Sequence, residues 1–269
     1  MGAFGQWLVA CRGIFAATLA LAVAFGLSAC GSPAPPASGA PAATHARVSA
    51  TPTRSKTPWT FAVSGDHPVV ANGSQDTYAA TPGAVCDGAE FAQDMSIGRQ
   101  VAAGFAIAGF PVAAALLAHF LKGNGTEVDY QAGSSISRQA LASSAFRALN
   151  EQVQAAILRQ LKAGAAQVRL PAAQLPTVAF DSTSSDLYWS FRGTQGLTVT
   201  GSGTRKNGRY VGTLTYVIRD SYGFPVSDVL DGFGPPMRYL QTVCGAPQHA
   251  GGAHWFPDTI TVTVPFSQP

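Results

Sequence analysis

The sequence predicts an α+β fold in which a helical N-terminal part is followed by an antiparallel, hairpin-rich β-sheet or open barrel. Three observations predict it. An uncharged run covers residues 101–121, and the apolar residues of 137–162 recur at helical spacing. After Pro171 and Pro176 the apolar period falls to two, with an Asn207-Gly208 pair between two such runs. Helical periods followed by strand periods are typical of the α+β class.

The N-terminus has the pattern of an export leader. Residues 1–29 contain no acidic side chain and a single basic one, Arg12, and an apolar stretch covers residues 13–27. Such a stretch is shorter than the ~20 residues that span a bilayer. The leader ends at Leu27-Ser28-Ala29-Cys30. This segment resembles the lipobox of bacterial lipoproteins, which implies acylation of Cys30 and cleavage after Ala29.

The next segment, residues 30–58, is rich in Pro, Ala, Ser and Thr and poor in apolar side chains, so we expect a disordered tether. Residues 59–269 then form an extracytoplasmic domain, helical over 89–165 and β-rich over 177–269. Of the 17 Lys and Arg residues, only Arg12 precedes Cys30, and all 14 Asp and Glu residues follow it. The mature chain is therefore expected to be nearly neutral. This balance argues against nucleic acid as a partner.

Two helical regions are expected before the sheet. Residues 101–121 are long enough to cross a membrane, but Pro111 and His119 favour a buried hairpin or two short helices broken near Gly109-Phe110-Pro111. Lys122 to Gly125 then ends the helix. The second helix covers 137–162 with one apolar stripe and stops at Gly164. The stripe residues are Phe146, Leu149, Val153, Ile157 and Leu161.

The strands are expected from alternation of apolar and polar residues. A first short strand covers 59–63, and later strands cover 187–192, 197–200, 209–218 and 259–264. Asn207-Gly208 predicts a hairpin turn before 209–218, because both residues tolerate positive φ. Threonines alternate with isoleucine and valines in the last strand, which predicts a sheet with one wet face.

The remaining cysteines are best explained by a structural bond. Cys11 leaves with the leader and Cys30 takes lipid, so Cys86 and Cys244 remain, and an oxidising compartment favours a disulfide between them. Cys244, His249 and His254 also invite a zinc interpretation, but their segment is rich in Gly and Pro and Cys244 is better used in the disulfide. We therefore expect no metal site there.

The richest polar cluster follows the long hairpin. Asp220, Tyr222 and Arg238 are the best candidates for catalytic residues; Asp228, Asp231 and Tyr239 lie near them in sequence. Carboxylates beside a tyrosine and an arginine can bind a cation or perform general acid–base chemistry. The alternative is a turn in which Asp220 accepts hydrogen bonds from backbone amides and Asp228 or Asp231 pairs with Arg238, and we favour it.

Residues 118–224 also resemble the C-terminal β domains of secreted bacterial toxins, including the colicin M-like lipid II hydrolases. The resemblance is carried by AHFLKGNGT, by YWSFRGTQ, by TVTG, by the Asn-Gly hairpin and by an Asp-x-Tyr-x-Phe pattern. It implies cleavage of a phosphodiester, with Asp220 and Tyr222 matching an Asp-x-Tyr-Asp motif. Gly223 replaces the second aspartate, and Val229-Leu230 stand near the place of a His-Arg pair. The departures remove a carboxylate and a basic group that this chemistry needs.

The sequence thus predicts a membrane-anchored envelope lipoprotein on the extracytoplasmic face. Its domain is expected to bind an envelope protein or glycolipid without catalysis and without a cofactor. One alternative is a hydrolase of phosphate-linked lipid or glycan that uses Asp220, Tyr222 and a divalent cation. Another alternative is an inhibitor or immunity-type partner of such enzymes.

Overall fold

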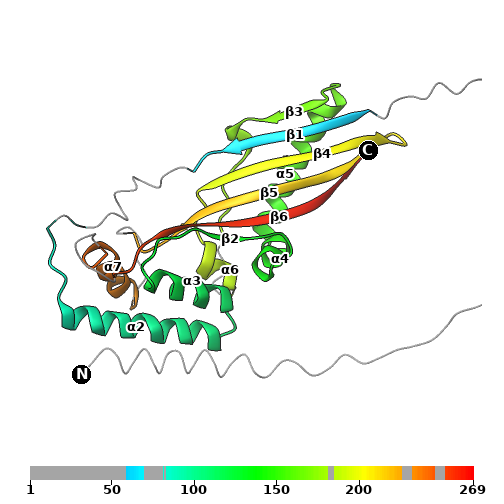
Figure 1. Ribbon diagram of the computed structural model, residues 1–269. Helices are drawn as coiled ribbons and strands as arrows, with labels where there is room; N and C mark the ends of the chain where they lie inside the picture. The colour runs from blue at the N-terminus through cyan, green and yellow to red at the C-terminus, as the bar shows by residue number, and fades with distance from the viewer. Residues whose placement is uncertain (1–58, 70–80, 82, 181–184, 226–231, 246–251) are drawn as a thin grey trace, which may run out of the picture. The chain divides into compact units, whose positions relative to one another are not determined.

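The described residues form a six-stranded sheet with helices on one face and at one end (Figure 1). The structure is a computed structural model that describes residues 59–69, 81, 83–180, 185–225, 232–245 and 252–269. All of them belong to one compact unit, Ser55–Pro269. The prediction of an α+β protein is confirmed.

The sheet has the strand order β2-β6-β5-β4-β1-β3. β4, β5 and β6 form an antiparallel meander, and β1 joins it antiparallel to β4. The two outermost strands pair in parallel, β3 with β1 and β2 with β6. The strands are β1 (Thr60–His67), β2 (Val128–Tyr130), β3 (Gln167–Leu170), β4 (Gly196–Lys206), β5 (Arg209–Tyr222) and β6 (Phe256–Gln268).

The hairpin between β4 and β5 has the turn that its sequence predicts. Asn207 and Gly208 take φ values of 51° and 78°, and Lys206 pairs with Arg209 across the turn. Two consecutive residues with positive φ match the right-handed twist of the strands that they join. The register of the whole β4–β5 pair follows from this turn.

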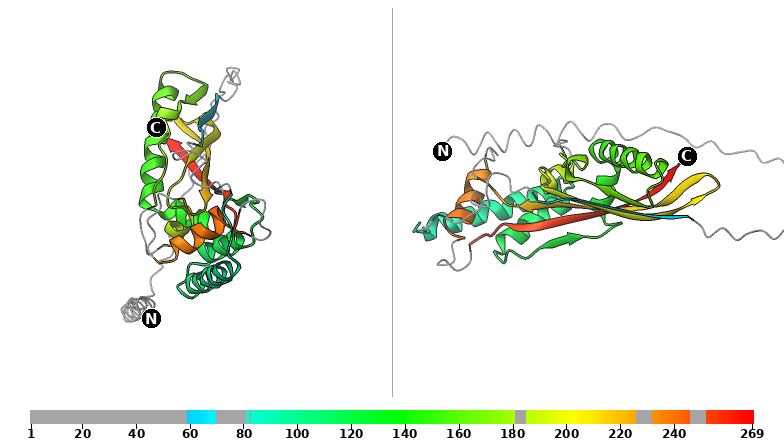
Figure 2. Two further views of the ribbon diagram at one scale, coloured as in Figure 1. Left: turned by 90° about the vertical axis from the view of Figure 1, so that its left-hand side faces the viewer. Right: turned by 90° about the horizontal axis from the view of Figure 1, so that it is seen from above.

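Helices occupy one face of the sheet and its lower end in Figure 1. α5 lies behind the strands in Figure 1, and Figure 2 shows this helix on one side of the sheet only. Its Phe146 packs edge-on against Tyr216 of β5, with ring centroids 5.1 Å apart. α2 packs on α3 and α7 at the end of the sheet. The helices are α2 (Gly88–Ile107), α3 (Pro111–Leu121), α4 (Ser135–Ala142), α5 (Ser144–Lys162), the 3-10 helix η2 (Ala172–Gln174), α6 (Asp186–Phe191) and α7 (Gly234–Thr242).

The uncharged run 101–121 is a bent pair of helices, as one of the two interpretations predicted. α2 ends at Ile107, Gly109 takes a φ of 84°, and Pro111 begins α3. Proline suits the first turn of a helix because a backbone N–H at that position would have no acceptor within the helix, so its absence costs nothing. Within the described residues, no helix combines the length and the hydropathy that a membrane crossing requires. Gly123 and Gly164, both with positive φ, follow the ends of α3 and α5 as expected.

Three details of the sequence prediction are wrong. Residues 187–192 do not form a strand, because Ser185 accepts a hydrogen bond from the backbone amide of Tyr188 and so starts helix α6. The helix expected over 137–162 is two helices, because extended Ser143 ends α4 and caps α5. The sheet is mixed and open, not antiparallel or barrel-like. Helices precede it only partly, since β1 comes before all the described helices and β2 and β3 come between helices.

The core lies between the helices and the inner face of the sheet. In β6 every even-numbered residue from Phe256 to Phe266 points into it, and in β5 the even-numbered residues from Leu214 to Tyr222 do the same. Glycines bring β1 close to β4: a Cβ on Gly203 would stand 2.4 Å from the Phe61 ring. The opposite face of the sheet carries exposed hydroxyl side chains, including Thr200, Ser202, Thr213 and Thr263.

Candidate functional site

Asp220 lies near the end of β5 on the inner face of the sheet. Its carboxylate accepts a hydrogen bond of 2.9 Å from the backbone amide of Ser221 and another from that of Gly193. Asp220 therefore accepts from backbone amides, as the structural interpretation expected, but it does so from within strand β5 and not from a turn. Burial raises the pKa of the Asp220 carboxyl from 3.8 to about 8, against the lowering effect of the two amides.

Directly opposite Asp220 on the neighbouring strand lies Asp258 of β6. Partners in an antiparallel pair share a face of the sheet, with Cβ atoms about 4.5–5.5 Å apart. Asp258 is completely buried, and neither of its carboxylate oxygens has a hydrogen-bond partner. Burial and the neighbouring Asp220 carboxyl raise the pKa of Asp258 well above its ordinary value. The two residues form a carboxyl pair in which Asp258 is fully buried and Asp220 is partly exposed. Two negative charges this close repel each other, which favours the protonated form of the pair.

Asp258 is not among the predicted site residues, although the sequence contains a signal for it. The predicted strand began at Thr259, and its apolar phase was Ile260, Val262 and Val264. Two residues before Ile260, the same alternation reaches Asp258, so a carboxylate lies on the strand face that carries the buried aliphatic residues. A charged side chain in the apolar phase of a strand is the pattern that points to a buried ionisable group.

Tyr222 lies two residues beyond Asp220 and belongs to an aromatic cluster. Its ring stacks on Phe256 with centroids 5.4 Å apart and meets Phe120 and Phe224 edge-on. The side chain is buried, and burial, followed by the charge of Asp258, raises the pKa of its hydroxyl. Tyr222 is therefore close to the carboxyl pair but packed as a core residue.

Two further polar groups surround the pair. Tyr130 of β2 has its pKa raised to about 12, first by burial and then by Asp258 and Asp186. Asp186 of α6 accepts hydrogen bonds of 2.9 and 2.8 Å from the amides of Val112 and Ala113, the first residues of α3. Asp186 thus caps α3 from another element, and its negative charge is favourable at that positive helix end.

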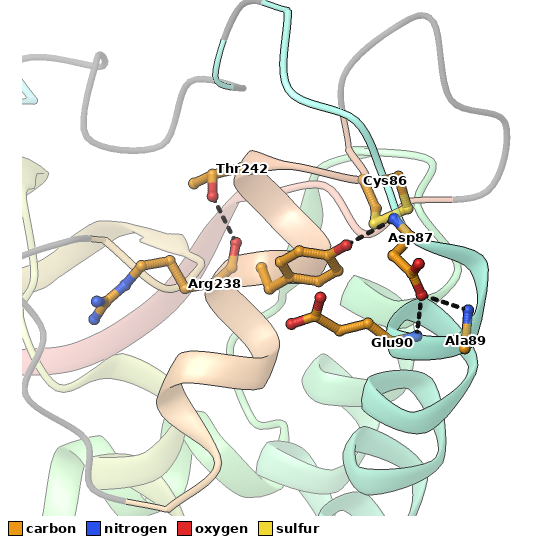
Figure 3. The surroundings of a disulfide bond; sticks show 8 residues. Cys86, Asp87, Ala89, Glu90, Arg238 and Thr242 are labelled. Atoms are coloured by element: carbon orange, nitrogen blue, oxygen red, sulfur yellow. Dashed lines mark hydrogen bonds between the residues drawn. A yellow bond between two sulfur atoms is a disulfide. The ribbon is translucent and has the colours of Figure 1, made fainter.

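Arg238 comes from a different part of the fold. It lies on α7, which packs against α2, and in Figure 3 its guanidinium points away from the disulfide. Asp220 and Tyr222 lie near Asp258 and Tyr130. Of the three candidate catalytic residues, the sheet therefore brings together Asp220 and Tyr222 but not Arg238. Asp228 and Asp231, the expected partners of Arg238, lie outside the described residues.

The predicted disulfide is confirmed. Cys86 and Cys244 are bonded, with Cα atoms 4.9 Å apart and a separation of 158 positions in sequence. The bond joins the start of α2 to the end of α7, and the amide of Asp87 donates a hydrogen bond of 2.8 Å to the Tyr239 hydroxyl beside it (Figure 3). Asp87 in turn caps α2 by accepting from the amides of Ala89 and Glu90.

Metal ligands are sparse in the part of the chain that the structure describes. No group of three or more His, Cys, Asp or Glu residues is arranged there to hold an ion. The disulfide occupies the sulfur of Cys244, and His249 lies outside the described residues. The carboxyl pair supplies two acidic side chains, fewer oxygen ligands than Ca²⁺ usually takes, whereas Mg²⁺ is often held by one or two carboxylates together with water.

Comparisons with protein-family models, with curated proteins and with solved structures find no match to this chain.

Proposed function

We propose that this chain is a lipid-anchored lipoprotein of the cell envelope, whose extracytoplasmic domain binds an envelope component without catalysing a reaction. The proposal that the domain does not catalyse a reaction is supported by the surroundings of the two candidate residues, Asp220 and Tyr222. Tyr222 is packed into an aromatic cluster, and Asp220 is held by backbone amides beside a second carboxyl. A nucleophile or general base must reach its substrate, and the buried Tyr222 does not offer that access, while the partly exposed Asp220 carboxyl is engaged by two backbone amides.

The disulfide supports the extracytoplasmic location. Disulfides form and persist in oxidising compartments and are rare in the reducing cytosol. The bond between Cys86 and Cys244 is therefore consistent with export by the leader that ends at Cys30. Acylation of that cysteine would fix the domain to the outer surface of the membrane.

The exposed hydroxyl face of the sheet is the surface that we assign to binding. Thr200 and Thr213 lie on neighbouring strands of this face and are exposed. The hydroxyl groups at the centre of this face suit a partner that offers hydrogen-bond groups, and the charged residues Asp66 and Arg219 on the same face are paired with each other.

The anchor is tested by labelling cells with an alkyne-bearing palmitate analogue. The wild-type protein should carry the label and fractionate with membranes, whereas Cys30→Ala should carry none. Cys11→Ala is the matched control and should keep the label, because Cys11 is predicted to leave with the leader. Label retained on the Cys30→Ala protein would refute the anchor.

A second candidate function is favoured by one observation. Asp258 places a carboxyl beside Asp220, and the loss of a carboxylate at Gly223 was a departure from the hydrolase pattern. The alternative is an envelope hydrolase that acts on a phosphate-linked lipid or glycan with a divalent cation. Purified protein incubated with Mg²⁺ and a polyprenyl-pyrophosphate-linked sugar should show no turnover under our proposal. The hydrolase would be supported if the wild type turned over the substrate, Asp220→Asn abolished the turnover and Thr213→Lys left it unchanged.

A further inference from the structure

A groove lies between α2 and the end of α3. It has a volume of about 370 Å³ and is lined by Met95, Arg99, Ala102, Ala118, Leu121 and Lys122. The helices approach closely because Gly98 is buried at their contact, where an added Cβ would stand 2.8 Å from Leu121. The groove is thus built by a close contact between two helices and is independent of the carboxyl pair.

The lining combines an apolar surface with two cations. Met95, Ala102 and Leu121 supply apolar surface, whereas Arg99 and Lys122 are exposed. Among the described residues, neither the guanidinium of Arg99 nor the ammonium of Lys122 makes a hydrogen bond or ion pair. The nearby carboxyl of Asp94 is buried, and burial together with Glu90 raises its pKa, which disfavours a negative charge beside the groove. An apolar groove with two available cations fits an anion that carries a hydrocarbon chain.

The helices that form the groove continue into an uncharged corner. No Asp, Glu, Lys or Arg occurs from Val101 to Leu121, and Ile107 at the end of α2 is 80% exposed. Phe105 packs against Trp189 nearby, with ring centroids 5.3 Å apart. Tryptophan beside exposed aliphatic side chains is typical of surfaces that lie at the headgroup level of a membrane.

We propose that the groove between α2 and α3 binds an anionic phospholipid of the membrane to which the chain is anchored, with Arg99 and Lys122 at the phosphate. The source of the lipid rests on the proposed function. The 28 residues between Cys30 and Trp59 reach on the order of 95 Å even when fully extended. A domain anchored through Cys30 therefore stays close to the bilayer, where a weak lipid site is filled by proximity.

The test uses the mature chain with Cys30→Ala, so that no acyl group contributes to binding. Its sedimentation is measured with vesicles of phosphatidylcholine and with vesicles that contain about 30% phosphatidylglycerol. Binding should require phosphatidylglycerol and weaken with salt. The double variant Arg99→Gln/Lys122→Gln should bind at least tenfold more weakly, since each cation near an anionic surface contributes about fivefold. The matched control is Arg159→Gln/Lys162→Gln, which removes the same charge from exposed positions on α5 and should change binding about twofold at most.

Equal binding to the two kinds of vesicle would overturn the proposal, and so would an equal loss of affinity in both double variants. Circular dichroism and the unfolding temperature of each variant check that the fold is kept. The labelling of Cys30 described above is a separate measurement. Absence of label would refute the anchor without changing the vesicle result, so the failure of one proposal is distinguishable from the failure of the other.

Discussion

The carboxyl pair of Asp220 and Asp258 should make the protein less stable as the pH rises. Both pKa values are raised in the folded state, that of Asp220 from 3.8 to about 8. A carboxyl whose folded pKa is raised contributes fully below its unfolded pKa of about 4, and the contribution is lost as the pH rises through the folded value. The free energy of unfolding should therefore decrease between pH 4 and pH 8.

The size of the effect follows from the shift. Each pKa unit corresponds to about 1.4 kcal/mol, so the full shift of Asp220 corresponds to on the order of 5 kcal/mol. Asp220 is only half-buried, and water near it reduces the effect to roughly half, about 2–3 kcal/mol. This is a large part of the 5–15 kcal/mol that usually stabilises a domain.

Asp258→Asn removes one charge of the pair and keeps the shape of the side chain. We expect it to unfold at a similar urea concentration to the wild type at pH 4.5 and to be about 2 kcal/mol more stable at pH 8. Asp129→Asn is the control, because Asp129 lies on β2, is exposed, and accepts a hydrogen bond from the Thr259 hydroxyl on the other face of the sheet. Urea unfolding from pH 4.5 to 8.5 measures both variants. A wild-type stability that is flat or rises over this range would contradict the reasoning.

Three further perturbations, one chemical and two by substitution, test the fold. Reduction of the Cys86–Cys244 bond should lower the free energy of urea unfolding by about 5 kcal/mol in the loop-entropy estimate for a crosslink of this separation, and equal stability with and without reductant would contradict it. Asp186→Ala should lower the unfolding free energy by about 2 kcal/mol, because two buried amides of α3 lose their acceptor, while Asp66→Ala, at an exposed carboxylate, should cost less than about 1 kcal/mol. Gly203→Ala should lower the unfolding temperature by several degrees because its Cβ meets Phe61 and the Val211 carbonyl, whereas Gly104→Ala, which has open space around it in α2, should leave the temperature unchanged or raise it.

Local patterns predicted the parts of the fold that depend on neighbouring residues. Asn207-Gly208 specified the β4–β5 turn, Pro111 specified the break between α2 and α3, and glycines after α3 and α5 marked their ends. In each case the decisive property belongs to the residue itself, such as a tolerance of positive φ or a missing amide hydrogen. Such properties act wherever the rest of the chain is placed.

Features that depend on distant residues were not predictable in this way. The alternation of Leu187, Trp189 and Phe191 resembles a strand, but Leu187 and Phe191 also share a helix face and both are buried in α6. The short strands β2 and β3 exist because β6 and β1 offer edges to pair with, and no local period marks them. The role of Asp258 was not predicted for the same reason, since only the register between β5 and β6 places it opposite Asp220.

β6 is an interior strand, paired with β5 on one side and with β2 on the other. Residues 256–268 therefore complete both the hydrophobic core and the carboxyl pair. A ribosome-released fragment that stops before Phe256 would expose the inner edge of β5 and leave β2 without a partner. The unpaired strand edges of such a fragment would be a template for aggregation.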